Sequence, residues 1–484
     1  MKDFNFYLES IGEIGFVEQT LHSVVYVSGL PEVRPNEIVL FESGEMGKVL
    51  TLNKEDAEIL LFKGSDVRVG SKVVRTGEIL KIPVGNNLLG RAIDPLGVTI
   101  DGKGQLTESE WVDVDKPPPK ITERKTPDKP METGVSLVDI VVPLARGQRE
   151  LVIGDRKTGK TEFLLQTMMT QAGKGAICIY AVIGQKRTDI LKLREFFESQ
   201  KVMKNIVIVA SSSSDISGLI YLTPYTAMSL AEYFRDQGLD VLLILDDMTT
   251  HAKVYREISL LSRRFPGRSS YPGDIFFIHA RIVERAGSFK KGSITLLPVA
   301  ESLMGDLSGY IQTNLMSMTD GHIFFDINLY NEGKRPSVNP FLSVTRVGHQ
   351  VQSKLVKDIG REVTSFLVTY DRMKQFLHFG AEVGQSARNV LALGSKVDIF
   401  FNQANFVNVD INVNILTLGG LWAGIWDDVE TLGLKRSFEK IILTFNTNDN
   451  YKKEVVDLIN KSKNFSELVT YLRREGEIIR NKLN

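Results

Sequence analysis

The stretch GDRKTGKT, from Gly154 to Thr161, fits the phosphate-binding pattern G-x-x-x-x-G-K-[ST] at every fixed position. It lies between the apolar run ELVIG and the helix-like run TEFLLQTM, as a strand–loop–helix unit requires. In such a unit the loop N–H groups face the phosphates, and the helix N-terminus adds a partial positive charge. The spacing predicts that Lys160 reaches the β- and γ-phosphates and that the Thr161 hydroxyl binds Mg²⁺. The alternative is a chance glycine-rich turn, which the flanking strand and helix disfavour.

A second apolar run, VLLILDD, ends in two acidic residues, Asp246 and Asp247. An aspartate at the end of a buried strand is the usual second carboxylate beside the metal of a P-loop site. Alone, the two residues fit an acidic cap on a following helix about equally well. Together with the P-loop, they favour Asp246 as a Mg²⁺ ligand.

The strand after the P-loop helix carries the residue on which hydrolysis of a bound nucleotide depends. In AVIGQKRTD, Gln185 follows the strand at a point from which its amide group can face a γ-phosphate. Hydrolysis needs a group that orients or deprotonates water, and a positive charge that stabilises the transition state. An amide orients water in some nucleotidases but is a poor general base. These residues predict nucleotide binding and leave hydrolysis open.

The distribution of apolar runs predicts three regions. Residues 16 to 80 contain short β-branched or aromatic runs separated by Gly, Pro and Asn, which is typical of a small barrel or sandwich. From Leu137, near-continuous apolar strands alternate with helical patterns, which indicates a doubly wound α/β domain. Beyond Lys354 the strand signals fade, and the runs that begin at Ser353 and Tyr451 have the pattern of amphipathic helices.

The composition argues against a nonspecific nucleic-acid-binding protein, a disulfide-linked protein and a membrane-spanning protein. Lys+Arg and Asp+Glu both total 59 among 484 residues, so no net positive field is available to hold nucleic acid nonspecifically. The one cysteine, Cys178, excludes an internal disulfide, and its apolar neighbours predict that it is buried. The N-terminal MKDFNFYLES predicts neither a secretory signal nor a transit peptide. The run NILTLGGLWAGIW is shorter than the roughly 20 residues that a bilayer span needs.

Taken together, these residues resemble the α-type subunits of F-type rotary ATP synthases, the non-catalytic partners of the catalytic β subunits. GDRKTGKT and AVIGQK match the family pattern, and the run from LLILDD to IVERAG follows it almost continuously. The segments IPVGNNLLGRAIDPLG, LPVAESLMGDLSGYIQTNLMSMTDGHIFF and RPSVNPFLSVTRVG are also in register. The resemblance extends from about residue 15 to about residue 400, which makes it far more specific than a P-loop alone.

The resemblance implies a multidomain α+β architecture. Its parts would be a short N-terminal extension (1–15), a β-barrel (16–80), a RecA-like P-loop domain (81–355) and a helical C-terminal domain (356–484). Three such subunits would alternate with three β subunits around a central stalk, and a peripheral-stalk subunit is a further expected partner. The expected ligands are ATP or ADP with Mg²⁺, and no nucleic acid is expected. The complex would lie at the cytoplasmic face of the cell membrane, in contact with it only through the ion-conducting sector.

The resemblance also implies roles for individual residues. Arg346 matches the arginine offered to the neighbouring β site, where it stabilises the transferring phosphoryl group, whereas an isolated arginine in such a turn more often forms a surface ion pair. Ser343 matches a serine that the family needs for activity. Tyr330 and Arg335 match positions on the adenine side, although a packed interface aromatic also fits Tyr330. The other implied ATP-binding residues are Gly154, Asp155, Arg156, Lys157, Thr158, Gly159, Lys160, Thr161 and Gln185, with Gln403 and Asn405 near the adenine.

Several positions distinguish this protein within the resemblance. Catalytic subunits and the related export ATPases carry glutamate where Gln185 stands, and the α-type subunits carry the amide. Lys157 replaces the usual glutamine, and Asn405 replaces the second of two glutamines. Glu382 is the one acidic residue in place of an aspartate-rich loop that touches the central stalk. The main alternative is a self-sufficient hexameric motor that moves RNA or exports protein, against which Gln185 and the balanced charge weigh. A third possibility is a variant rotary ATPase that performs other mechanical work.

Overall fold

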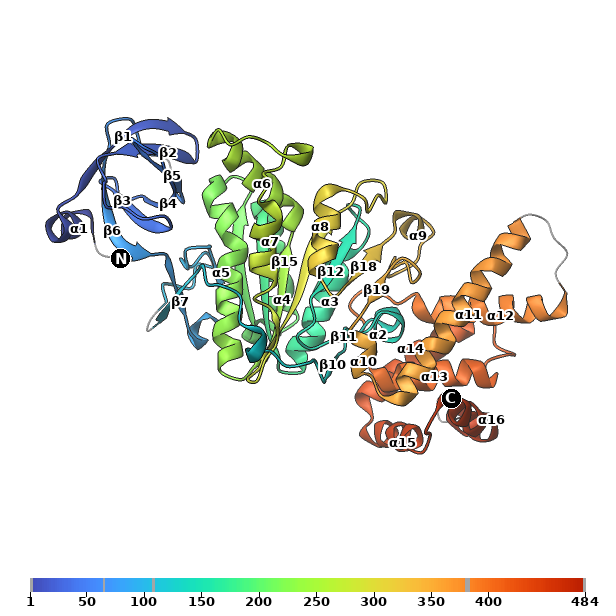
Figure 1. The fold of residues 1–484 in the computed structure, drawn as a ribbon. Helices are drawn as coiled ribbons and strands as arrows, with labels where there is room; N and C mark the ends of the chain where they lie inside the picture. Colours follow the sequence, from blue (N-terminus) through green and yellow to red (C-terminus); the bar gives the residue numbers. More distant parts are fainter. Residues whose placement is uncertain (1–2, 64–65, 107–108, 379–383, 482–484) are drawn as a thin grey trace. The chain divides into compact units, whose positions relative to one another are not determined.

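The computed structural model describes residues 3–63, 66–106, 109–378 and 384–481 (Figure 1). The protein forms two compact units, and each is described by itself. Unit 1 contains residues 1–126, 175–301 and 307–319, and unit 2 contains residues 127–174, 302–306 and 320–484. The expectation at Glu382 lies outside the described residues.

Unit 1 begins with a closed barrel of antiparallel strands in the order β1-β2-β5-β4-β3-β6. Its strands are β1 (Ile14–Leu21), β2 (Val24–Ser28), β3 (Glu37–Phe41), β4 (Met46–Leu52), β5 (Ala57–Leu61) and β6 (Lys72–Ile79). Val25, Val39, Phe41 and Ile59 are fully buried in its core, because β-branched and aromatic side chains pack well on a pleated surface. Helix α1 (Phe4–Ile11) packs on the barrel, and the closed strand order decides for a barrel over a sandwich.

A parallel sheet forms the second part of unit 1, with its strands in the order β17-β15-β13-β14-β8. These strands are β8 (Ala92–Ile93), β13 (Ile177–Gln185), β14 (Ile206–Ser212), β15 (Asp240–Asp246) and β17 (Ser293–Glu301). The helices of this part are α4 (Arg187–Ser199), α5 (Ser217–Asp236), α6 (Met248–Leu261), α7 (Ile275–Val283) and α8 (Tyr310–Met318). Helix α5 contacts β13, β14 and β15 (Figure 1), so the central strands are buried and near-continuously apolar. Cys178 of β13 is buried, as predicted.

Three further pairings that involve short strands are present, two in unit 1 and one at the start of unit 2. In unit 1, β7 (Lys81–Val84) pairs with β9 (Glu110–Asp113), and β16 (Gly287–Ser288) pairs with β17. In unit 2, β10 (Pro130–Met131) pairs with β11 (Leu144–Ala145), on either side of helix α2 (Ser136–Val141).

The strand–loop–helix unit predicted from the P-loop lies in unit 2. Strand β12 (Glu150–Gly154) leads through the loop into helix α3 (Lys160–Gly173). Strand β12 pairs in parallel with β18 (Gly321–Phe325), which pairs in turn with the short antiparallel strand β19 (Val344–Thr345). Helices α9 (Ile327–Asn331) and α10 (Gly348–Val351) follow β18 and β19.

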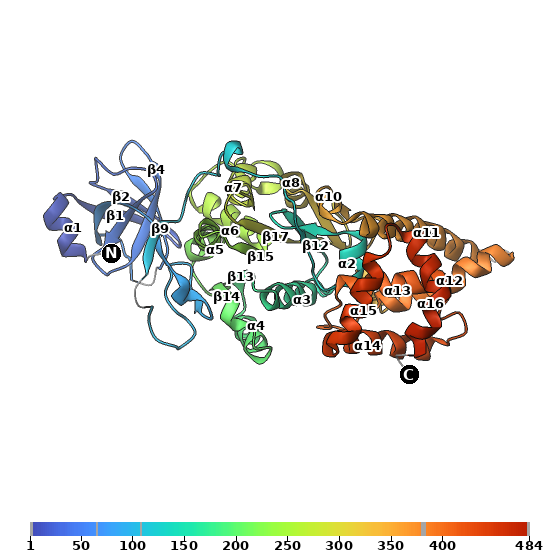
Figure 2. The ribbon, with the colours of Figure 1, turned by 90° about the horizontal axis from the view of Figure 1, so that it is seen from below.

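The C-terminal part of unit 2 is helical. Its helices are α11 (Lys354–His378), α12 (Gln385–Phe401), α13 (Ile411–Ala423), α14 (Thr431–Thr447), α15 (Asp449–Asn460) and α16 (Phe465–Asn481). Helix α13 contacts α11, α12, α14, α15 and α16 (Figure 2), which explains why its sequence is apolar on nearly every side. Among the described residues, no helix is both long enough and apolar enough to pass through a membrane.

The structure confirms the predicted fold class: an N-terminal barrel, a central α/β P-loop domain and a C-terminal helical region. It adds a break in the last amphipathic run, which divides into α15 and α16. The break follows from a new cap, because the Asn464 side chain accepts a hydrogen bond from the Glu467 N–H at 2.9 Å.

Candidate nucleotide-binding site

The loop between β12 and α3 has the backbone geometry of a phosphate-binding nest. Lys157 (φ 62°) and Gly159 (φ 90°) both lie in the left-handed region, which turns successive N–H groups toward one side of the loop. A Cβ atom at Gly154 would lie 2.4 Å from the Phe325 carbonyl oxygen, so glycine is needed for β12 to pack on β18 there. The N-terminus of α3 adds partial positive charge beside the nest.

Side-chain hydrogen bonds hold this loop in place. Lys160 Nζ donates to the carbonyl oxygens of Gly154 (2.7 Å) and Asp155 (2.6 Å). Thr158 Oγ1 donates to the same Asp155 carbonyl at 2.7 Å. The Asp155 carboxylate accepts a hydrogen bond from the Ser302 hydroxyl, so it is engaged by the protein itself. Phosphate oxygens are stronger acceptors for an ammonium group than carbonyl oxygens, so an incoming phosphate can draw Lys160 from them.

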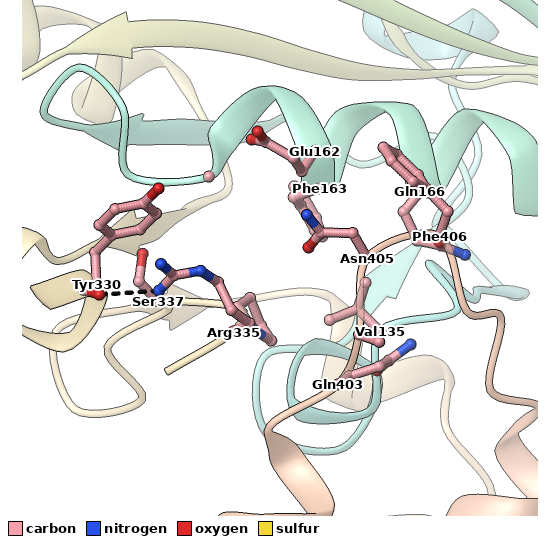
Figure 3. Close-up of a pocket in the computed structure, with 13 residues that line it drawn as sticks. Val135, Glu162, Phe163, Gln166, Tyr330, Arg335, Ser337, Gln403, Asn405 and Phe406 are labelled. Carbon is pink, nitrogen blue, oxygen red and sulfur yellow. Dashed lines mark hydrogen bonds between the residues drawn. The ribbon is translucent and has the colours of Figure 1, made fainter. Parts of the chain in front are cut away.

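A pocket of about 530 Å³ opens beside the first turns of α3 (Figure 3). Its other walls come from residues 330–337 and 403–406, and all of its lining residues belong to unit 2. The residues expected on the adenine side line this pocket together with Gly159 at the end of the P-loop: Tyr330, Arg335, Gln403 and Asn405.

Tyr330 and Arg335 form one side of the pocket and contact each other (Figure 3). The Arg335 guanidinium lies 3.6 Å from the centre of the Tyr330 ring, in a cation–π contact. Arg335 Nη1 also donates to the Tyr330 carbonyl oxygen at 2.9 Å. Because the guanidinium covers one face of the ring, a base that stacks here has the other ring face or the guanidinium plane available.

Gln403 and Asn405 lie on the opposite side and differ in how far the protein engages them. Gln403 Oε1 accepts a hydrogen bond from the Ser136 N–H at 3.0 Å, and its Nε2 donates to the carbonyl oxygens of Gly134 (2.7 Å) and Val407. This amide therefore holds its own segment to the residues before α2. Asn405 is exposed, and its side chain makes no hydrogen bond within the described residues. Of the two, Asn405 is the side chain available to a base edge.

Sequence reasoning missed several lining residues. Glu162, Phe163 and Gln166 face the pocket from α3, and Phe406 faces it from the segment after Asn405. Helical spacing could have identified Glu162 and Gln166, because residues four apart lie on one face of a helix. Phe406 has no comparable signal, since the loop that carries it has no periodic pattern.

Asp246 and Gln185 lie together in unit 1. Gln185 Nε2 donates to Asp246 Oδ2 at 2.9 Å, and the Tyr180 hydroxyl donates to the same oxygen at 2.7 Å. A carboxylate at position 185 would face Asp246 at this distance and would repel it. The amide instead provides a hydrogen bond, so the site is built for a neutral group at this position.

Asp247 has a different function from its neighbour. Its carboxylate accepts hydrogen bonds from the Thr250 N–H (2.5 Å) and hydroxyl (3.2 Å), which makes it the N-cap of α6. Burial, together with the adjacent Asp246 carboxylate, raises the pKa of Asp247 to about 7. The two roles considered for this pair are therefore divided: Asp247 caps the helix, and Asp246 remains the candidate metal ligand.

Arg346 follows β19 in unit 2 and is exposed. Its backbone N–H donates to the Asp320 carbonyl oxygen at 3.2 Å, and its carbonyl oxygen accepts from Gln350 Nε2 at 3.0 Å. Its guanidinium makes no hydrogen bond or ion pair with any residue that the structure describes. Ser343 supports this segment, because its hydroxyl accepts from the Phe324 N–H (2.9 Å) and donates to the Asn339 carbonyl oxygen (2.7 Å). Hydrogen bonds therefore hold the backbone at Arg346, while its guanidinium is exposed and has no salt-bridge partner among the described residues.

A parallel strand that leads through this loop into α3, with a pocket beside the helix, defines a P-loop nucleotide-binding protein. Family comparison makes the class specific. The nucleotide-binding domain of the ATP synthase alpha/beta family matches residues 134–345, and the C-terminal domain of the same family matches residues 352–472. The protein belongs to the ATP synthase alpha/beta family.

Curated relatives extend over nearly all of the sequence. ATP synthase subunit alpha of Petrotoga mobilis is 36% identical over 484 residues, which span 98% of this protein and 95% of the relative. The protein of the same name from Neorickettsia sennetsu is 35% identical over 97% of this protein and 94% of its own length. That of Dictyoglomus turgidum is 40% identical over 83% and 80%, respectively. The resemblance inferred from the motifs is therefore confirmed.

Proposed function

We propose that this protein is a nucleotide-binding, non-catalytic alpha subunit of a rotary ATP synthase or ATPase. It binds ATP or ADP through the P-loop and lends Arg346 to a catalytic site on a neighbouring beta subunit. The observation that carries the proposal is the hydrogen bond from Gln185 to Asp246 at 2.9 Å. This contact supports the proposal because an amide that donates to Asp246 is a poor general base, in a protein whose sequence contains the complete P-loop pattern.

The binding residues divide by chemistry. The loop N–H groups and Lys160 hold the phosphates, and the pocket with Tyr330, Arg335 and Asn405 takes the base. Thr161 of unit 2 and Asp246 of unit 1 are each proposed as a Mg²⁺ ligand, since oxygen atoms are the ligands this ion prefers. The ion, when bound, neutralises part of the phosphate charge.

The proposed assembly contains three such subunits alternating with three beta subunits around a central stalk, with a peripheral-stalk subunit as a further partner. The complex lies peripherally at the cytoplasmic face of the cell membrane, and only its ion-conducting sector enters the bilayer. A self-sufficient RNA or protein-export motor is disfavoured, because such a motor needs its own catalytic carboxylate. The 59 basic and 59 acidic residues also leave no net positive charge to attract the phosphate backbone of RNA.

The purified subunit alone should bind Mg-ATP without turning it over. We expect saturable binding of a fluorescent ATP analogue together with phosphate release at background level, because Gln185 cannot accept a proton from water. Addition of the beta partner should give turnover. Brisk hydrolysis by the subunit alone, insensitive to the partner, would show that it is a motor in its own right.

Lys160→Ala should weaken nucleotide binding by this subunit at least about tenfold, because a charge-assisted contact to phosphate is lost. Turnover of the assembled complex should change much less, since catalysis belongs to the neighbouring site. Equilibrium binding to the isolated variant and steady-state turnover of the complex measure the two effects. Lys461→Ala is the matched control, since Lys461 is an exposed lysine of unit 2 that lies outside the P-loop and does not line the pocket. A large loss of turnover with unchanged binding would contradict the assignment of Lys160 to a non-catalytic site.

A further inference from the structure

A second cavity lies within unit 1, between the barrel and helices α5 and α7. Its lining comes from β4, from Phe62 after β5, from the segments around Pro35 and Leu80, from the residues after β9, and from the two helices. A neighbouring lobe of about 620 Å³ shares six of its residues: Asn36, Lys48, Asp115, Tyr221, Tyr225 and Arg281. None of these residues lines the pocket beside the P-loop.

Three charged side chains stand where the two lobes meet. Lys48 Nζ lies 3.6 Å from Asp115 Oδ2, and Arg281 Nε lies 2.9 Å from Asp115 Oδ1. The second contact is close but lacks the geometry of a hydrogen bond, so Asp115 Oδ1 and Arg281 Nε are both buried without a hydrogen-bond partner among the described residues. One carboxylate therefore serves two cations, and the shared lining carries a surplus positive charge.

The Lys48 side chain carries this surplus charge in a largely buried position. Only 16% of it is exposed, against 30% for Arg281 and 27% for Asp115. Burial lowers the pKa of Lys48 because the charged amine loses water, and the nearby Asp115 opposes this shift. The smaller lobe has one further cation in its wall, Arg264, which is already paired with Glu58 at 3.3 Å. A second anion beside Lys48 and Arg281 would complete the charge balance of the cluster.

The rest of the larger lobe is apolar and aromatic. Phe62, Val114 and Leu222 are buried in its wall. The hydroxyls of Tyr221 and Tyr225 share one hydrogen bond at 3.0 Å, which leaves one of the two O–H groups able to donate to a ligand, and the two rings provide apolar surface. A cavity with apolar walls and a few convergent charges is the usual form of a site for a small amphipathic molecule.

We propose that this cavity binds a small apolar monocarboxylate, with its carboxylate between Lys48 and Arg281 and its ring or alkyl group against Tyr221 and Phe62. A single negative charge matches the surplus of one, whereas a phosphate dianion would exceed it and meet repulsion from Asp115. An amine would be repelled by both cations. The site goes beyond the proposed nucleotide function, because its lining lies entirely in unit 1 and includes none of the nucleotide-binding residues.

The test uses the full-length protein and 4-fluorophenylacetate as the probe, with binding followed by fluorine NMR. We expect saturable binding with a dissociation constant of about 1 mM or tighter, which is reasonable for a ligand of this size. The amine of similar shape, 4-fluorobenzylamine, should not compete. Absence of saturable binding by the wild-type protein, or equal binding of the amine, would overturn the proposal and leave the three charges as a structural ion cluster.

Two variants with opposite expected effects locate the site. Lys48→Met keeps an unbranched side chain of nearly the same length and removes the charge, so affinity should fall at least about tenfold. Asp115→Asn removes the competing carboxylate, so affinity should rise. Lys160→Ala should leave probe binding unchanged, which separates this proposal from the nucleotide function. Unchanged affinity in both cavity variants would overturn the assignment, and if Lys48→Met does not fold, the direction of the Asp115→Asn effect decides alone.

Discussion

Replacement of Arg346 by alanine should lower ATP turnover of the assembled complex by roughly 10³-fold or more, while assembly and nucleotide binding by this subunit remain intact. An arginine supplied to a phosphoryl-transfer site from a neighbouring subunit stabilises charge that develops only in the transition state. Its loss should therefore appear in kcat rather than in KM.

The geometry of Arg346 explains why the effect should be specific. The guanidinium is exposed, and among the described residues it makes no ion pair, so its removal breaks no hydrogen bond or salt bridge of the subunit and changes only longer-range electrostatics at Glu150 and His322. The backbone around it is held by Asp320 and Gln350, and the Ser343 hydroxyl braces the preceding turn. A folded variant with normal thermal stability is therefore expected.

Two further variants make the test of Arg346 sharp. Arg346→Lys keeps the charge but loses the planar fork of donors, so its turnover should be intermediate. Arg361→Ala removes another exposed arginine of unit 2, on α11, and should change turnover less than twofold, roughly the usual effect of a surface substitution. Normal turnover by an assembled Arg346→Ala complex would remove its assigned role. A matching loss in Arg361→Ala would show that the effect is not specific to the site.

The sequence predicts local features of this molecule well, because local features depend on short-range patterns. The glycines, Lys160 and Thr161 identify the P-loop from spacing alone, and near-continuous apolar runs identify β13, β14 and β15 as buried strands. The split of the final helical run at Asn464 is not predicted, since a cap inside a periodic pattern gives a weak signal.

Contacts between distant residues are not predictable in the same way. The sequence identifies Gln185 as the decisive residue, but its hydrogen bond to Asp246 depends on two adjacent parallel strands that end at the same edge of the sheet. For Gln403 and Asn405, the resemblance to the family predicts only that both residues lie near the base, and not how each amide is hydrogen-bonded. The structure engages the first amide with backbone groups and leaves the second available, a distinction that no spacing rule contains.

Loss of one partner of the buried Arg285–Glu232 pair should be the most destabilising charge change in unit 1. Arg285 is fully buried, and Glu232, on α5, is only 3% exposed. Arg285 Nε and Nη2 donate to the two oxygens of Glu232 at 3.0 and 2.7 Å. The same guanidinium donates to the Val114 carbonyl oxygen (3.0 Å) and to the Ser229 hydroxyl (2.8 Å). This one side chain therefore joins α5, the residues that follow α7 and the segment after β9.

Glu232→Ala should cost about 3–5 kcal/mol of unfolding free energy, because it leaves the Arg285 charge buried without a counter-ion. Urea unfolding and hydrogen exchange of α5 would measure the loss. The matched control is Lys103→Ala, in an ion pair with Glu198 whose side chains are 48% and 38% exposed. It should cost less than about 1 kcal/mol, since solvent screens exposed pairs.

The double variant Glu232→Leu/Arg285→Met separates the penalty of an unpaired charge from the intrinsic strength of the pair. It removes both charges and fills the space with apolar groups, so we expect it to be more stable than Glu232→Ala. Its remaining cost should come from the Val114 carbonyl and the Ser229 hydroxyl, which lose their donor, and from Arg235, whose Nη1 loses Glu232 Oε1 at 3.8 Å. If the double variant is instead less stable than either single variant, the bidentate pair itself contributes net stability, and its desolvation cost is more than offset by the hydrogen bonds of Arg285.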